Sequence, residues 1–352
     1  MTKRRITILI FFYFSVPIFG QKINIEPVEK YFAMTDLLRQ NISISTKTWN
    51  DFIRYDGIQL YLQNQGFDSS YLEDYRKTME IVYMPKNDSI LKVRLQNNEK
   101  YFLVWEINNY KIEEENFKQY IANLKLNSNE FLNTNYKMCY EYLPKRMQKK
   151  AAKTTLYFIP LYNDAVAEGN DIIFTLYCAY HFDKLKNGVL GGHEIHHILR
   201  KNKKLLTTKD SIIYEALTLV LNEGSADLID KKYTADKQCP IDMAFYSYLI
   251  DEGKNYIANL DSAIIDHISI KKAMTKKDFQ SIVPMSGHIP GCFMATVIER
   301  NGLKDEMIKH IDDPIQFFLL YNKAAKIDIQ KPYIYSDITI NYLKTIKQKI
   351  YR

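Results

Sequence analysis

Residues that interrupt a compact fold are scarce in this chain of 352 residues, which has 12 glycines and 10 prolines. The sequence contains no Pro/Gly/Ser-rich linker, no internal repeat and no low-complexity segment. With 46% apolar and 25% charged residues, the chain can bury a large core and is long for a single domain. The composition therefore predicts one large domain or two interlocked ones.

Cysteine is also scarce, and its four positions are far apart in the sequence: Cys139, Cys178, Cys239 and Cys292. Such wide spacing excludes the paired cysteines of a zinc ribbon. Two disulfides, in any of three pairings, and four buried thiols are both compatible with the sequence.

The apolar run near the N-terminus, Ile6 to Phe14, is shorter than the ~20 residues that a membrane-spanning helix needs, and Pro17 follows it. The run has a basic head and is followed by the small residue Gly20. This pattern predicts a signal peptide over residues 1–20, with cleavage near Gly20 and export to the periplasm or the medium. We expect no stable membrane span after cleavage, and a retained anchor is the weaker alternative.

The excess of positive charge is small, with 48 Lys and Arg against 41 Asp and Glu. The basic runs KRMQKK and RKNKK are short and contain no interleaved aromatic residues. A surface that binds nucleic acid combines basic and stacking side chains, so we expect no nucleic-acid partner.

Helical and strand patterns occupy different parts of the chain. Residues 21–150 are mostly helical in pattern, and their aromatic residues are expected in the core. Residues 151–352 begin with two apolar runs around NDAVAEGND, which predict a β-hairpin, and continue with long helical patterns. We expect a predominantly helical α+β fold with a small antiparallel sheet beside a zinc-binding helix pair.

The segment GGHEIHHILR concentrates three histidines and a glutamate in ten residues. His193 and His197 are four residues apart, so on a helix both project from one face and can bind one metal ion. Glu194 lies about 100° around that helix, within reach of a water on the metal. The pattern is H-E-x-x-H, with His196 at a variable position.

A zinc site needs a third protein ligand, and the segment NEGSAD offers Glu223 and Asp227 on one helical face. We expect Glu223 to bind the metal and Asp227 to accept the N–H of a ligating histidine. Glu215 is the rival ligand, but it lacks an acidic neighbour four residues later.

HEIHH followed by NEGSAD resembles the gluzincin metallopeptidases, including their thermolysin-like members. The HIPG segment and the predicted hairpin are similar to those of exported bacterial zinc-dependent peptidases. The resemblance implies that His193, His197 and Glu223 bind Zn²⁺ and that Glu194 is not a ligand. It covers the two motif segments and the hairpin, not the rest of the chain.

His288 stands in the loop SGHIPG, directly before a helical pattern, where it could line a cleft and stabilise an oxyanion. Tyr214 and Tyr246 are alternatives for this role, and an ordinary loop histidine is the plain reading. If the strand Thr155 to Tyr162 lies at a sheet edge, it could pair with an extended peptide, although a purely structural strand is equally compatible.

These observations predict an exported zinc metallopeptidase in which Glu194 acts as general base toward a zinc-bound water, with a peptide or protein as substrate. Two other classes stay open: a zinc metallohydrolase of a non-peptide amide or ester, and a non-catalytic zinc-containing surface binding protein. A structural zinc site is closed by four protein ligands and has no use for a base such as Glu194, which disfavours the last class.

Overall fold

The computed structural model of the chain describes residues 21–151, 153–201, 210–269 and 275–350. The predicted signal peptide, residues 1–20, lies outside these ranges. Among the described residues, no helix combines the length and the apolar character that crossing a membrane requires. All four cysteines are unpaired thiols, so the disulfide alternative is wrong.

Helices make up most of the N-terminal half, as predicted. After the short strand β1 (Lys22–Asn24) the helices are α1 (Glu26–Arg39), α2 (Thr46–Ile53), α3 (Asp56–Gln65), α4 (Ser69–Tyr83), α5 (Asp88–Leu95), α6 (Phe102–Ile112), α7 (Glu114–Leu126) and α8 (Ser128–Tyr140). Their aromatic side chains form core, as expected: Tyr31, Tyr75 and Tyr110 are completely buried.

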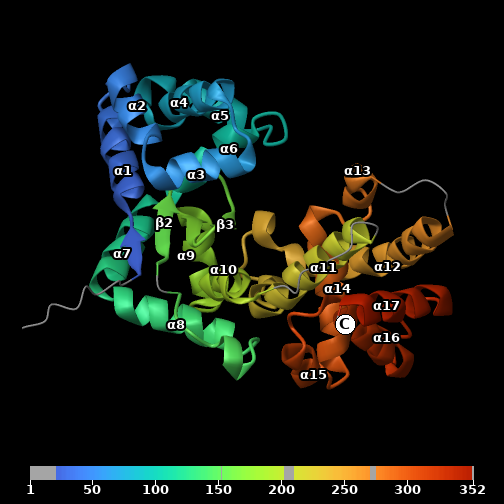
Figure 1. The fold of residues 1–352 in the computed structure, drawn as a ribbon. Helices are drawn as coiled ribbons and strands as arrows, with labels where there is room; N and C mark the ends of the chain where they lie inside the picture. Colours follow the sequence, from blue (N-terminus) through green and yellow to red (C-terminus); the bar gives the residue numbers. More distant parts are fainter. Residues whose placement is uncertain (1–20, 152, 202–209, 270–274, 351–352) are drawn as a thin grey trace, which may run out of the picture.

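The second half contains the remaining strands and a helical body. Its elements are β2 (Thr155–Ile159), β3 (Ala165–Glu168), β4 (Asp171–Thr175), α9 (Leu176–Leu185), α10 (Val189–Leu199), α11 (Ser211–Asp230), α12 (Phe245–Ser269), α13 (Lys276–Gln280), α14 (His288–Arg300), α15 (Lys304–Lys309), α16 (Pro314–Ile327) and α17 (Asp337–Ile350). The N-terminal helices gather around the sheet, and the C-terminal helices gather beyond α10 and α11 (Figure 1).

The sheet is mixed rather than antiparallel, with the strand order β1-β2-β4-β3. The two predicted apolar runs, β2 and β4, pair in parallel, and the segment expected as their loop supplies β3, which pairs antiparallel with β4. Burial explains this order. Nearly every residue of β2 and β4 is buried, as central strands require, whereas β3 is only half-buried and lies at the edge.

This topology also corrects the predicted position of the strand Thr155 to Tyr162. The strand β2 lies between β1 and β4, so its backbone groups are already paired on both sides. The edges of the sheet are β1 and β3, and β3 is the edge strand that packs against α10. In the part of the chain that the structure describes, no strand pairs with the outer side of β3. A peptide could therefore add to β3 but not to β2.

Helices α10, α11 and α14 form the body next to this edge. Helix α10 packs against α8 and α11, and α11 packs closely against α14. A Cβ added at Gly224 would lie 2.3 Å from the carbonyl oxygen of Gly291, so the backbones of α11 and α14 touch where they cross. Only glycine permits this approach.

Candidate metal centre

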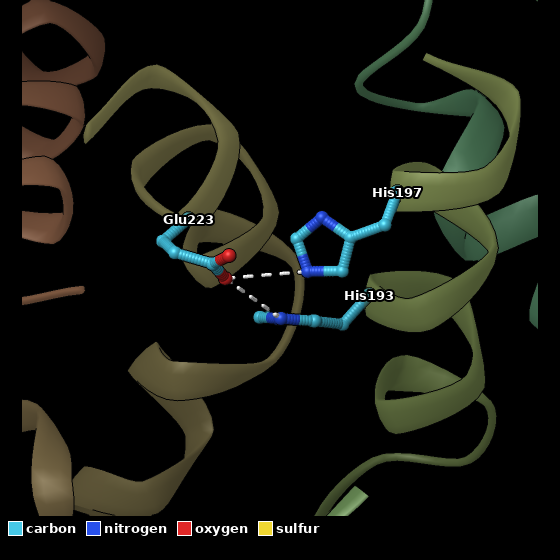
Figure 2. A group of neighbouring side chains, drawn as sticks. All are labelled: His193, His197 and Glu223. Carbon is cyan, nitrogen blue, oxygen red and sulfur yellow. Dashed lines mark ion pairs between the residues drawn. The ribbon is translucent and has the colours of Figure 1, made fainter. Parts of the chain in front are cut away.

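His193, His197 and Glu223 converge from two helices, as the sequence predicts. Both histidines project from one face of α10 toward Glu223 of α11 (Figure 2). Glu223 Oε2 lies 3.2 Å from His197 Nε2 and 3.7 Å from His193 Nε2. Atoms about 2.0 to 2.2 Å from a tetrahedral zinc lie about 3.3 to 3.6 Å from one another, so the two imidazoles and the carboxylate fit this ion.

Charge around these atoms also favours a cation. Burial alone would lower the pKa of His193, but the carboxylates of Asp230 and Glu223 together raise the pKa well above its usual range. Burial would raise the pKa of Glu223, but His197 and His288 hold it well below its usual range. Negative groups that stabilise a proton on an imidazole at this place also stabilise a divalent cation there.

Glu194 lies beside the three candidate ligands without belonging to them. Its Oε1 is 4.0 Å from His193 Nε2, and the side chain lines a cleft of about 500 Å³. The carboxylate therefore faces the space in which a substrate and a water would lie.

His288 begins α14 and points to the same place. Its Nε2 is 3.3 Å from Glu223 Oε2, yet it does not belong to the ligand atoms that all lie within 4.8 Å of one another. The preceding Gly287 has a φ of +104°, and a Cβ there would lie 2.7 Å from the carbonyl carbon of Leu219. This close contact with α11 sets the start of α14, and with it the position of His288 at the cleft.

Asp227 lies in the site but has a different partner from the one predicted. Its Oδ1 is 2.8 Å from His288 Nδ1 and 4.0 Å from His193 Nδ1. Asp230 takes the predicted place, with its Oδ1 2.9 Å from His193 Nδ1. Four residues after Glu223 a helix has turned by about 40° beyond a full circle, and seven residues after it is within about 20° of the original direction. Asp230 thus faces α10, and Asp227 faces α14.

A carboxylate can only accept a hydrogen bond, so each of these aspartates places the imidazole proton on Nδ1. The Nε2 atom of His193 is then directed at the cleft in the tautomer that can bind a metal, and His288 also directs its Nε2 at the cleft.

Lys231 is a residue of the site that the sequence pattern did not reveal. Its Nζ lies 2.7 Å from Asp230 Oδ2, and it also lines the cleft. Burial would lower the pKa of Lys231, but Asp230 and Asp227 raise it above its ordinary value. The ammonium group therefore stays charged and fixes the carboxylate that fixes His193.

A second group of candidate ligand atoms, on His193, Asp227 and Asp230, is less suited to a metal. Asp227 is already hydrogen-bonded to His288, and Asp230 is paired with the ammonium of Lys231. Both aspartates thus orient histidines, although Oδ2 of Asp227 makes no hydrogen bond among the described residues.

Other residues considered from the sequence lie elsewhere. His196 is completely buried and does not belong to the described residues that line the cleft. Glu215 is exposed and borders a separate cavity. Tyr214 and Tyr246 do not belong to the described residues that line the cleft.

The other wall of the cleft comes from β3 and α3. Gln65 donates to Asp164 at 3.0 Å, and Asn64 donates to Glu168 at 3.0 Å, so α3 holds both ends of the edge strand. Burial, together with the nearby carboxylate of Glu194, raises the pKa of Asp164 to about 6. The N-terminal half thus contributes to the cleft.

A family model described as "Putative zinc dependent peptidase (DUF5700)" matches residues 49–330, most of the chain and all of the residues that form the metal centre. Neither a curated protein nor a solved structure matches the chain. By the extent of this match, the chain belongs to the DUF5700 family, whose description is that of a zinc-dependent peptidase.

Proposed function

We propose that this chain is a gluzincin-type zinc metallopeptidase that hydrolyses peptide bonds. The observation that carries the proposal is the convergence of His193, His197 and Glu223 beside an unligated Glu194 at the floor of an open cleft. Three ligands leave a coordination position for the reaction, as catalytic zinc sites do.

Zinc bound by these residues would lower the pKa of a water toward ~7 and polarise the carbonyl of the substrate. Glu194 accepts the proton of the attacking water and then delivers it to the leaving amine. His288 donates a hydrogen bond from Nε2 to the oxygen that becomes negative during attack. For this it must carry protons on both ring nitrogens, and Asp227 and Glu223 favour that state, since they raise its pKa against the effect of burial.

The edge strand β3 supports a peptide as substrate. Ala165, Val166 and Ala167 line the cleft with a free strand edge, and an extended chain can pair with such an edge through its backbone. Backbone pairing holds the chain across the site independently of its side chains.

The proposal is tested by elemental mass spectrometry and peptide cleavage on the wild type, His193→Ala and Glu194→Gln. We expect about one zinc per chain in the wild type and in Glu194→Gln, loss of zinc in His193→Ala, and cleavage in the wild type alone. Zinc without cleavage of any peptide would refute the peptidase assignment.

We also propose that the enzyme acts outside the cytoplasm, because residues 1–20 have the pattern of a signal peptide. N-terminal sequencing of the protein recovered from the periplasm or medium should start near Gln21. Recovery of the intact N-terminus from the cytoplasm alone would refute export.

A further inference from the structure

A second cavity, of about 530 Å³, adjoins the catalytic cleft. Met285 and Ser286 line both spaces, so only the turn that they form separates them. Cavities of about 300–1,000 Å³ are typical of ligand pockets. Because this cavity adjoins the cleft of the candidate metal centre, a substrate bound in that cleft could extend into it.

One face of α11 connects the two spaces. Ile212, Ala216 and Leu219 line the second cavity, and Glu223 follows on the same helical face, at intervals of four, three and four residues. At 1.5 Å per residue, Leu219 lies about 6 Å and Ala216 about 10 Å from Glu223 along the helix axis. An extended peptide advances about 3.3 Å per residue, so the cavity is two or three substrate residues from the carbonyl under attack.

The separating turn has an unusual backbone. Met285 and Ser286 have φ values of +51° and +53°, and Gly287 has +104°. Two successive left-handed residues that are not glycine each cost about 1 kcal/mol or more, and such conformations are typical of functional sites. In this turn Met285 is 47% exposed and lines both the cleft and the second cavity. The flexible thioether of methionine can adapt to different apolar partners.

We propose that this cavity is a specificity pocket that accepts a bulky apolar side chain of the peptide substrate. Its occupant follows from the walls. Most of the described residues that line the cavity are apolar, namely Ile212, Ala216, Leu219, Val283 and Met285, whereas Glu215, Gln280 and Ser286 are polar. Met285 and Ser286 also line the cleft in which the peptide backbone is proposed to lie. The inference rests on the proposed peptidase function and adds to it a preference for leucine- or phenylalanine-like residues.

Cleavage of a short-peptide library tests the pocket. The wild type should enrich large apolar residues at one position, two or three residues from the scissile bond. Ala216→Leu fills the cavity and Ile212→Asn makes its wall polar, and each should reduce this preference at least about 10-fold. Ile329→Asn is the matched control for the polar substitution, since Ile329 is 94% exposed and outside the cavity, and it should keep the preference. Cleavage without an apolar preference, or a preference unchanged in both pocket variants, would overturn the pocket while the peptidase function stands.

Binding separates the two proposals. In the Glu194→Gln background, a labelled peptide with leucine at the enriched position should bind at least about 10-fold more tightly than its alanine counterpart. If the wild type cleaves no peptide, no enriched position is known. The binding of peptides with leucine or alanine is then compared at each position of the peptide in turn. A leucine advantage that Ala216→Leu and Ile212→Asn remove would support the pocket although the peptidase function fails. No leucine advantage at any position would overturn the pocket.

Discussion

Replacing Asp230 by asparagine should weaken zinc binding, whereas the same change at Asp227 should not. Asp230 Oδ1 is 2.9 Å from His193 Nδ1, and Asp227 Oδ1 is 4.0 Å from it. Loss of a carboxylate that orients a ligating histidine typically costs 10- to 100-fold in metal affinity. We therefore expect Asp230→Asn to raise the zinc dissociation constant by about 10- to 100-fold, or about 1.4 to 2.7 kcal/mol.

The substitution also leaves Lys231 without its partner. The side chain of Lys231 is 15% exposed, so the cost should be below the 3–5 kcal/mol of a fully buried broken pair, at about 2 kcal/mol. Urea unfolding of the zinc-free protein measures this loss of folding stability separately from the loss of zinc affinity.

Competition with a chromogenic chelator at pH 7.5 gives the zinc affinities, and peptide cleavage at saturating zinc gives kcat. Asp227→Asn removes the same charge from the same helix but disturbs His288, so we expect unchanged zinc affinity and a kcat at least about 10-fold lower. Equal losses of zinc affinity in the two variants would refute the assignment of the two aspartates.

Three further changes test other parts of the structure. Glu194→Gln should retain zinc and lower kcat about 10²- to 10⁴-fold, measured by cleavage and metal analysis; loss of zinc would mean that Glu194 is a ligand. Gly291→Ala places a Cβ 2.4 Å from the carbonyl oxygen of Val220, so it should destabilise the fold by about 1–3 kcal/mol in urea unfolding; unchanged stability would contradict the backbone contact. The pKa of Glu106 is raised by burial to about 8, from a reference value of 4.5, so folding takes up a proton between these values and stability falls as pH rises through them. Glu106→Gln should remove this slope, worth about 3 kcal/mol at pH 7, and a wild type without it would show that Glu106 is ionised in the fold.

The convergence of the three candidate ligands could be predicted from the sequence because helical spacing defines the face on which each of them lies. His193, His197 and Glu223 need only two helices facing each other, and the four-residue interval defines the face. Asp230 was missed because its role depends on how α11 faces α10 and α14 at once, which spacing within one segment does not reveal. The third acidic residue on the Glu223 face, in ADLID, was the signal that could have found it.

The sheet was predicted less well because strand order depends on distant partners. The three residues of β1 are too few to show a strand pattern in the sequence. Nevertheless, β1 pairs with β2, which lies more than a hundred residues later in the chain. The turn-forming residues on both sides of AVAE, in NDAVAEGND, favour a loop, whereas AVAE itself forms a half-buried edge strand.

The contacts of α3 with β3 have a consequence for how activity could be controlled by proteolysis. Gln65 and Asn64 hold the strand proposed to bind the substrate, so removal of the N-terminal helices would take away a wall of the cleft. Maturation by trimming this region would inactivate the enzyme rather than release it. Loss of the chain from Gln21 through α3 is therefore expected to abolish the proposed cleavage activity, whereas removal of residues 1–20 alone should leave these contacts intact.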